Sequence, residues 1–465
     1  MPLTTVTGAI WGDEGKGKIL DATTEKADIV VKFQGGSNAG TTYVIDGKEY
    51  VLHLIPGGAL RGKRCLIGPN VVMRADNMCK EIDELEMDID LGIDPRTHIT
   101  MPYHLALDYS REKARDKKLE KSKGDNRKSA GSIGTTLSGI GPTYEQQKSR
   151  IGIRFHELVG DKKILEERVT DNYNRAKKEI ELINEQRMVM PNRKIIDGKY
   201  IIEDVDLTLD HCLDVAFKAG DKLRNYLSDI TKELRDALKE EKNVFAQGAQ
   251  GTMLDIMFGN YPKVTSSQPI ATAVASALGI SHYPDKAIGV LKAYITKVGS
   301  GPVVTCLDDQ RWPVDEQFSD ENAKQIRAKG HEFGATTGRA RRVGWPDMIV
   351  VKYASELNGF TDIAVTRLDL LADINPIKVA VAYKIDGKIV EEYSDWDMDA
   401  LAKAEPVYRE LQGFGDISKV RTYQALPEEA KEYIRMIEHW SNAKVSIISV
   451  GPERKETIYR DFKAF

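Results

Sequence analysis

Short apolar runs recur along the chain, separated by glycine-rich turns or helical patterns. Residues 5–11 form a β-rich run, glycines follow at once, and the helix-like stretch 19–22 leads to a second apolar run at 27–33. A strand, a glycine turn, a helix and a strand in this order are typical of the opening of a parallel α/β sheet. Further candidates for buried strands lie at residues 287–298, 362–371 and 444–450.

Two Asp-Gly pairs and one leucine-rich pattern add detail. Asp46–Gly47 and Asp386–Gly387 each separate two apolar runs, which is a strong signal for a hairpin turn. Spacings of four, three, four and four residues predict one face of a single helix, formed by Leu223, Leu227, Ile230, Leu234 and Leu238. We therefore predict an α/β fold with a large mixed, mostly parallel central sheet. We expect one catalytic domain over residues 1–465, with helical insertions at about 105–130 and 155–240.

The composition changes this picture little. Of 465 residues, 41% are hydrophobic, and 67 Lys and Arg nearly balance 71 Asp and Glu. Such a balance disfavours a dedicated nucleic-acid or polybasic membrane binder. The four cysteines lie far apart, the first residues lack a signal-peptide pattern, and no apolar run approaches the roughly 18 residues of a membrane span. We expect a cytoplasmic protein.

A candidate phosphate-binding loop follows the first strand. Residues 12–18 fit the pattern G-x-x-x-x-G-K, in which backbone N–H groups cradle phosphate at a helix N-terminus. The Ser or Thr that usually binds magnesium is missing, because Ile19 occupies its place. Asp13 could supply the metal oxygen instead, or act as a base. The plain alternative is that Lys16 and Lys18 are surface charges.

Several further loops combine glycine with hydroxyl, amide or arginine side chains. They lie at residues 34–42, 134–142, 248–252, 264–267 and 334–342. Arginines in the last of them suit bidentate recognition of carboxylate or phosphate. Asp369, at the end of a candidate strand, could accept the N–H donors of guanine. The basic segment 111–128 precedes one glycine loop and is either a solvated helix or loop, or a phosphate-facing arm.

Taken together, these loops resemble those of the adenylosuccinate synthetase family. The motifs are WGDEGKGK at residues 11–18, GAQGT at 248–252 with VTSS at 264–267, and GATTGR at 334–339 with Gly344–Trp345. The resemblance implies a P-loop-like, GTP-binding core in a homodimeric, Mg²⁺-dependent ligase. It would join L-aspartate to C6 of inosine monophosphate (IMP), with GTP converted to GDP and phosphate. The likeness runs from Gly8 to near Arg454, most of the chain.

The resemblance also implies roles for individual residues. The catalytic set would be Asp13, Lys16, Gln250 and Thr41, with Asp13 and Gly40 as magnesium ligands. Contacts to GTP would come from Gly12, Glu14, Gly15, Gly17, Lys18, Gly40, Thr42, Arg341, Arg367, Asp369, Ser449, Gly451 and Pro452. Contacts to IMP would come from Asn38, Gly134, Thr136, Arg150, Gln250, Thr265, Val298 and Arg339, with Arg150 acting across the dimer. Aspartate would lie on Thr336, Thr337, Gly338, Arg339 and Arg341.

Three positions depart from the family pattern. Thr41 stands where the family has a catalytic histidine, and a threonine cannot supply the charge of an imidazolium. Ala340 thins the arginine run, and Arg367 replaces the usual lysine before the guanine-reading aspartate. His53 is either a substitute donor or a structural residue. Three readings therefore stay open: an active IMP ligase, the same chemistry on GMP or dGMP with GTP or ATP, and a non-catalytic nucleotide-binding protein.

Overall fold

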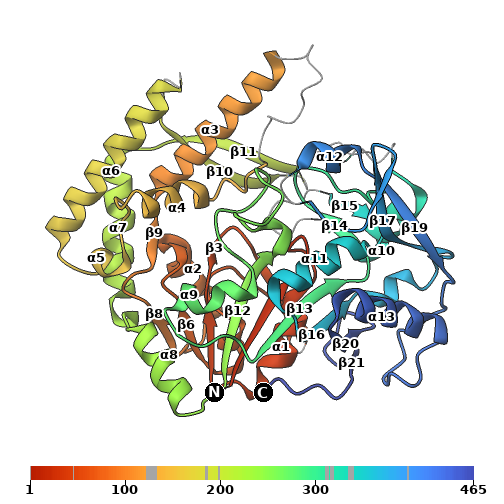
Figure 1. Ribbon diagram of the computed structural model, residues 1–465. Helices are drawn as coiled ribbons and strands as arrows, with labels where there is room; N and C mark the ends of the chain where they lie inside the picture. Colours follow the sequence, from red (N-terminus) through yellow and green to blue (C-terminus); the bar gives the residue numbers. More distant parts are fainter. Residues whose placement is uncertain are drawn as a thin grey trace.

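A large twisted sheet forms the centre of the molecule in the computed structural model (Figure 1). The structure describes residues 2–45, 47–121, 134–183, 187–196, 199–308, 314, 319–333, 340–394 and 397–465. In this part of the chain, nine strands make the sheet. Their order across it is β21 (Thr457–Tyr459), β20 (Lys444–Ser449), β16 (Asp362–Thr366), β13 (Lys286–Lys292), β1 (Leu3–Gly8), β12 (Val244–Gly251), β2 (Ile29–Lys32), β6 (Arg64–Ile67) and β8 (Leu91–Ile93).

Almost all neighbouring strands of this sheet run parallel. The first strand lies at its centre, with Leu3 opposite Val244 of β12 and Thr4 opposite Lys286 of β13. Only β20 and β21, at one edge, pair antiparallel. The predicted mixed, mostly parallel sheet is thus confirmed.

Helices cover both faces of the sheet, because successive strand residues are apolar on both sides. On β2, Val30 belongs to one core, while Ile29 and Val31 belong to another on the opposite face. The helices are α1 (Lys16–Thr23), α2 (Ala75–Leu85), α3 (Pro102–Lys121), α4 (Ile140–Lys148), α5 (Phe155–Leu158), α6 (Lys162–Leu182), α7 (Leu209–Leu223), α8 (Ile230–Lys239), α9 (Val274–Leu278), α10 (Glu321–Gly330), α11 (Met348–Asn358), α12 (Met398–Lys403) and α13 (Glu428–Ser441).

The remaining strands form small sheets around the central one. They are β3 (Gly35–Gly36), β7 (Val71–Arg74) and β9 (His98–Thr100); β4 (Thr41–Ile45) and β5 (Lys48–Leu52); β10 (Val189–Ile196) and β11 (Lys199–Asp206); β14 (Ile295–Lys297) and β15 (Arg342–Gly344); and β17 (Ile377–Ile385), β18 (Lys388–Val390) and β19 (Glu405–Leu411). In Figure 1, α3 and α6 project from one corner of the molecule, away from both chain ends.

Both predicted hairpins are confirmed. The strands β4 and β5 pair antiparallel, with Ile45 opposite Lys48, although Asp46 lies outside the described residues. Between β17 and β18, Asp386 and Gly387 both adopt left-handed backbone conformations, as the tight turn requires. None of the described helices is both long and apolar enough to cross a bilayer.

The predicted single helix through residues 223–238 is wrong. The helix α7 ends at Leu223, the chain extends at Leu227, and α8 begins at Ile230 behind the capping side chain of Asp229. Leu227 is correspondingly exposed, whereas the other four leucine and isoleucine positions are buried. The Asp229 cap therefore starts a second helix, even though the spacing of the apolar residues fits a single one.

Two predicted strands are also shorter than expected. Residues 287–298 divide into β13 and the separate strand β14, because Ala293 and Tyr294 lead the chain out of the central sheet. Residues 362–371 form β16 and then a short 3₁₀ turn over Leu368–Leu371. Both changes occur where the chain leaves the carboxyl edge of the central sheet. This edge is where the candidate site lies.

Candidate active site

A cleft of about 510 Å³ opens at the carboxyl ends of the central strands. Trp11–Asp13 follow β1, and Asn38–Gly40 follow β2 and β3. Gln250 lies next to the end of β12, and Lys297, the last residue of β14, is followed in the cleft wall by residues 298–300. Crevices at the carboxyl ends of parallel strands are where open α/β sheets commonly bind ligands. The cleft therefore brings together loops that are far apart in the sequence.

The loop after β1 is closed on itself by Glu14. Its buried carboxylate accepts hydrogen bonds from the backbone N–H groups of Ile10 (3.1 Å) and Gly12 (2.6 Å). The Lys16 ammonium donates to the Gly12 carbonyl at 2.7 Å and to Glu14 at 3.1 Å. The loop thus contains backbone N–H groups and an ammonium group that could bind a phosphate. In this conformation they donate hydrogen bonds to Glu14 instead.

The helix α1 begins directly behind this loop. Gly15, at its N-cap, adopts a left-handed conformation (φ 78°) that favours glycine. A side chain on Gly17 would overlap the carbonyl group of Thr42, so glycine lets α1 press against β4. Thr41 and Thr42 therefore lie beside the start of α1, and both are half-buried.

The fully buried side chain of Gln34 ties the segment after β2 to β12 and to the loop that contains Ser267. Its amide nitrogen donates to the Ala249 carbonyl at 2.7 Å, and its amide oxygen accepts from the Ser267 hydroxyl at 2.9 Å. Nearby, Gln250 donates to the Asn38 side chain at 3.2 Å, and the other amide atom of Gln250 is buried without a hydrogen-bond partner. An unpartnered buried amide oxygen is what a site awaiting a ligand donor would present.

Two carboxylates of α3 hold the glycine loop at residues 134–139. Glu112 accepts from the backbone N–H groups of Gly134 (2.6 Å) and Thr135 (3.3 Å), and Asp108 accepts from the N–H of Gly139 at 3.0 Å. Asp108 and Glu112 lie one helical turn apart and are both buried. The basic segment 111–128 is helical up to Lys121, and residues 122–133 lie outside the described part of the chain.

A buried ion cluster lies against Asp13. Glu332, with no exposed surface, binds Lys292 at 2.9 Å and Arg341 at 2.7 Å, and accepts from the Tyr294 hydroxyl. Burial alone would raise the pKa of Glu332, but Lys292 and Arg341 outweigh burial and lower it to about 2. Arg341 also faces Asp13, with 3.4 Å between its Nε atom and an Asp13 carboxylate oxygen.

A second group of predicted residues gathers at the far side of α1. Lys18 donates to the Ser449 hydroxyl at 2.8 Å and to the Gly451 carbonyl at 2.6 Å. Burial lowers the pKa of Lys18 to about 8, although the Glu456 and Asp369 carboxylates oppose this shift. One carboxylate oxygen of Asp369 is buried without a hydrogen-bond partner, beside Arg367 and Lys18. Pro452 follows on the surface.

The family model of adenylosuccinate synthetase matches residues 5–458, nearly the whole chain. The chain belongs to the adenylosuccinate synthetase family. Adenylosuccinate synthetases of Clostridium novyi (strain NT) and Thermoanaerobacter sp. (strain X514) are 39% and 40% identical to it. These matches cover 97% and 99% of this chain, and 98% and 100% of the two relatives. The resemblance predicted from the motifs is confirmed.

Solved structures agree with this assignment. The fully ligated adenylosuccinate synthetase of Plasmodium falciparum has a TM-score of 0.86 and 32% identity, over 99% of this chain and 100% of that one. The succinoaminodeoxyadenylate synthetase of cyanophage S-2L, bound to dGMP and dATP, has a TM-score of 0.53 and 14% identity over 98% of this chain and 95% of that one. The phage likeness shows a shared fold alone. Adenylosuccinate synthetases are GTP-dependent ligases that form a C–N bond and need Mg²⁺, and this chain is a ligase of that family.

Most residues expected to contact IMP or the metal line this cleft. They are Asp13, Asn38, Gly40, Gly134, Thr136, Gln250, Thr265 and Val298, and Gly12, expected to contact GTP, lines it as well. Arg150 is different: it is exposed at the end of α4 and does not line the cleft of its own chain. The predicted aspartate loop, Thr336, Thr337, Gly338 and Arg339, lies outside the described residues. Of that set, Arg341 is described.

Position 41, where the resemblance predicts a histidine, is occupied by a threonine. Thr41 pairs with Leu52 in the β4–β5 hairpin. His53 lies next to Gly40, since a side-chain carbon on Gly40 would come within 3.1 Å of the His53 Nε2 atom. Burial, and then Lys32, lower the pKa of His53 from 6.5. A histidine that is neutral near pH 7 cannot supply an imidazolium charge.

The sequence reasoning missed several residues of the cleft wall. Arg111 and Arg115 of α3 line it, together with Lys263 and Lys297. Arg111 binds Glu145 and Glu179, both at 2.6 Å. The basic character of residues 111–128 signalled the two arginines, because a helix places Arg111 and Arg115 on one face. Nothing in the sequence signalled Lys297, whose importance depends on its burial.

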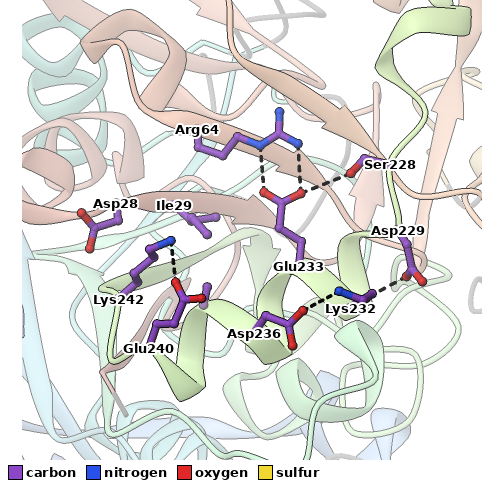
Figure 2. A pocket seen from close by; sticks show the side chains of 11 residues that line it. Asp28, Ile29, Arg64, Ser228, Asp229, Lys232, Glu233, Asp236, Glu240 and Lys242 are labelled. Atoms are coloured by element: carbon purple, nitrogen blue, oxygen red, sulfur yellow. Dashed lines mark hydrogen bonds and ion pairs between the residues drawn. The ribbon is translucent and has the colours of Figure 1, made fainter.

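A second depression, of about 600 Å³, lies at the amino ends of β2 and β6 (Figure 2). None of the predicted site residues lines it. Its cations are paired: Arg64 with Glu233 at 2.8 Å, Lys232 with Asp236 at 2.7 Å, and Lys242 with Glu240 at 2.8 Å. These ion pairs leave the cations of this surface satisfied.

Proposed function

We propose that this chain joins L-aspartate to C6 of IMP, with conversion of GTP to GDP and phosphate, in the synthesis of adenine nucleotides. The observation that carries the proposal is the cleft itself. Within one cavity it gathers a carboxylate that could act as a base (Asp13), two amide side chains (Asn38 and Gln250) and the glycine loop at residues 134–139. This set matches the needs of a purine monophosphate with a reacting six-position.

Asp13 is proposed to remove the proton from N1 of IMP. The O6 atom of IMP then attacks the γ-phosphorus of GTP, GDP leaves, and a 6-phosphoryl intermediate forms. The neutral amine of aspartate next attacks C6, the C6–O bond breaks, and inorganic phosphate leaves. Two protons are released, one from N1 and one from the amine; the departing phosphate takes up one, and the other passes to water. The position of Asp13 supports this role, because its carboxylate lines the cleft and, among the described residues, its hydrogen bonds and ion pairs are two contacts of 3.4 Å to Arg341.

The oxygen donors around Asp13 fit Mg²⁺. A carboxylate and the Gly40 backbone carbonyl are hard oxygen ligands, which this ion prefers. In the part of the chain that the structure describes, no three acidic, histidine or cysteine side chains gather into a metal site. Asp13 and Gly40 would therefore hold the ion together with substrate phosphate oxygens and water, as is usual for Mg²⁺. Bound there, it would neutralise charge on the transferring phosphoryl group.

The loop after β1 is proposed to hold that phosphoryl group. The backbone of Gly15 and Gly17 and the ammonium of Lys16 supply the donors, and Gly12 and Glu14 shape the loop. For Lys16 to reach a phosphate, it would leave Glu14, its partner at 3.1 Å in this conformation. Asp369, with Arg367 beside it, would accept the N–H donors of guanine, next to Ser449, Gly451 and Pro452. Its unpartnered, buried carboxylate oxygen supports this role.

Thr41 is proposed to act only as a hydrogen-bond donor near O6, with water completing the donor set. The neutral His53 beside Gly40 fits a structural role better than that of a general acid. A lost acid or oxyanion donor typically slows an enzyme by about 10²–10³-fold. We therefore expect a slow ligase rather than a chain without activity.

Arg150 is proposed to contact the IMP phosphate of the other subunit in a homodimer. Its exposure, and its absence from the lining of its own cleft, support this role. The test mixes two inactive variants, Arg150→Leu and Asp13→Ala. Mixed dimers contain one site with both native residues, so activity should return on mixing. Activity that stays absent after subunit exchange contradicts a shared site.

A substrate matrix tests the proposed reaction. IMP, GMP and dGMP are each combined with GTP, ATP or dATP in the presence of aspartate and Mg²⁺. We expect phosphate release and a new 6-alkylaminopurine absorbance to be greatest with IMP and GTP, and to disappear in Asp13→Ala. Greater turnover with dGMP than with IMP would refute IMP as the acceptor. No turnover with any combination would instead favour a nucleotide-binding role.

A further inference from the structure

Lys297 is a buried cation in the cleft wall for which the ion pairs of the site provide no partner. It is only 2% exposed, and its ammonium nitrogen makes no hydrogen bond within the described residues. The ammonium lies 3.8 Å from the centre of the Trp11 ring, and both residues line the cleft. Cation–π contact offsets part of the cost of burying a charge, but it does not replace a counter-ion.

The surroundings of Lys297 add positive charge. In the β14–β15 pair, Lys297 stands directly opposite Arg342, which is 1% exposed and donates to the carbonyls of Gly299 and Gly301, both at 2.8 Å. A side chain on Gly301 would touch both Lys263 and the Lys297 ammonium, so these two lysines flank the same turn. Like charges opposite each other in a sheet are destabilising.

The acidic group described close to Arg342 is occupied elsewhere. Asp308, close to Arg342, binds Arg327 at 2.6 Å and accepts from the backbone N–H of Val343 at 2.7 Å. Burial, then Arg342 and Lys263, hold the pKa of Lys297 well below its usual value, opposed only by Cys306. An anion entering the cleft would supply the missing negative charge.

We infer that Lys297 recognises a carboxylate of the amino donor. This inference deepens the proposed function and depends on it for the identity of the donor. Trp11, under the Lys297 ammonium, precedes the proposed base Asp13 by two residues, and Val298 follows Lys297 in the same wall. An anion held here would lie beside the segment that carries the proposed base, whereas Gly134 and Thr136, on another wall of the cleft, are expected to contact IMP. Arg341 already binds Glu332, so Lys297 is the cation of this wall that lacks a protein partner among the described residues.

Equilibrium binding without turnover tests this inference. Succinate, a dicarboxylate that cannot react, and L-aspartate are titrated calorimetrically into protein saturated with IMP and Mg²⁺, without GTP. We expect Lys297→Met to raise both dissociation constants about 10- to 100-fold, as for the loss of a charge-assisted hydrogen bond. The dissociation constant of IMP should stay within about twofold. Lys297→Arg should retain most of the affinity.

Controls separate this role from a structural one. Lys232→Met removes a surface lysine of the second depression and should change none of these constants. The melting temperature of Lys297→Met should equal or exceed that of the wild type, because an unpaired buried charge is removed. If the methionine variant fails to fold, Lys297→Gln, which keeps a donor but loses the charge, takes its place with the same expectations.

The outcomes distinguish this inference from the proposed reaction. A rise confined to the IMP constant would assign Lys297 to phosphate and overturn the inference, and unchanged constants would overturn it as well. If the wild type binds succinate through Lys297 but ligates nothing, the proposed reaction fails and the carboxylate site stands. If the wild type joins aspartate to IMP but Lys297→Met binds aspartate as tightly as the wild type, the proposed reaction stands and the inference about Lys297 fails.

Discussion

Replacing Glu332 by glutamine should cost this protein a large share of its stability. The Glu332 carboxylate is fully buried and binds Lys292, Tyr294 and Arg341. Glutamine has nearly the same size but carries no charge. Lys292 and Arg341 would then stay buried without their shared counter-ion, and the new amide group would have to turn its own donors away from them. Breaking a buried ion pair in this way typically costs 3–5 kcal/mol.

The pKa of Glu332 gives a second route to the magnitude. Lys292 and Arg341 outweigh the effect of burial and lower this pKa from 4.5 to about 2. One pKa unit corresponds to about 1.4 kcal/mol, so the charged form is favoured by roughly 3 kcal/mol in the folded protein. Because the folded pKa is depressed, this stability is present above pH 4.5 and is lost as the pH falls towards 2. The difference between wild type and variant should shrink over the same range.

The assay is urea unfolding of wild type and Glu332→Gln at pH 7 and again near pH 3.5. Glu233→Gln is the matched control, since Glu233 also binds an arginine, Arg64, at 2.8 and 3.0 Å, but both side chains are about one-quarter exposed. Pairs this accessible to water contribute little, so the control should lose about 1 kcal/mol or less. A loss for Glu332→Gln that is as small as the control, or that is equal at both pH values, would refute the reasoning.

Three further predictions concern the site. Thr41→His should raise turnover at least about tenfold if position 41 still faces O6 of the acceptor; an unchanged or lower rate in the phosphate-release assay would mean that the pocket is built differently. Asp369→Asn should raise the KM for GTP about 10- to 100-fold and leave the KM for IMP unchanged, and equal effects on both would argue against guanine reading. Because Lys18 has a pKa of about 8, it loses its proton above that pH and with it one of its donors. The KM for GTP should therefore rise between pH 7 and 9 in the wild type, whereas Lys18→Met should show a high value that does not vary with pH.

Glycine loops behind apolar strands are the features that sequence reasoning predicted best. The strand, the turn and the helix form in the predicted order, although β1 covers Leu3–Gly8 instead of residues 5–11. Glycine at positions 15 and 17 is required by a left-handed backbone and by a close contact. Backbone conformations and close contacts of this kind require glycine at fixed positions, so they can be recognised in the local sequence. This also explains why residues from four distant segments could be expected in one cleft.

Features that depend on capping or on burial were not predictable in the same way. The break at Leu227 depends on the Asp229 cap and on where β8 lies, neither of which the apolar spacing contains. Lys18 has the sequence signature of a phosphate-loop lysine, yet its ammonium points to Ser449 and Gly451, more than 400 positions along the chain. Lys297 looks like any lysine in a strand until its burial is known. Long-range packing decides each of these cases.

The Gln34 side chain has a consequence for the evolution of this site. Through one amide it joins the loop after β2 to Ala249 of β12 and to Ser267 in a further loop. A mutation at either end of the Gln34–Ser267 contact would leave a buried polar group without its partner. Among relatives, positions 34 and 267 should therefore change together or not at all. Substitutions in the three segments that Gln34 joins are then no longer independent of one another, so this part of the cleft should evolve as one unit.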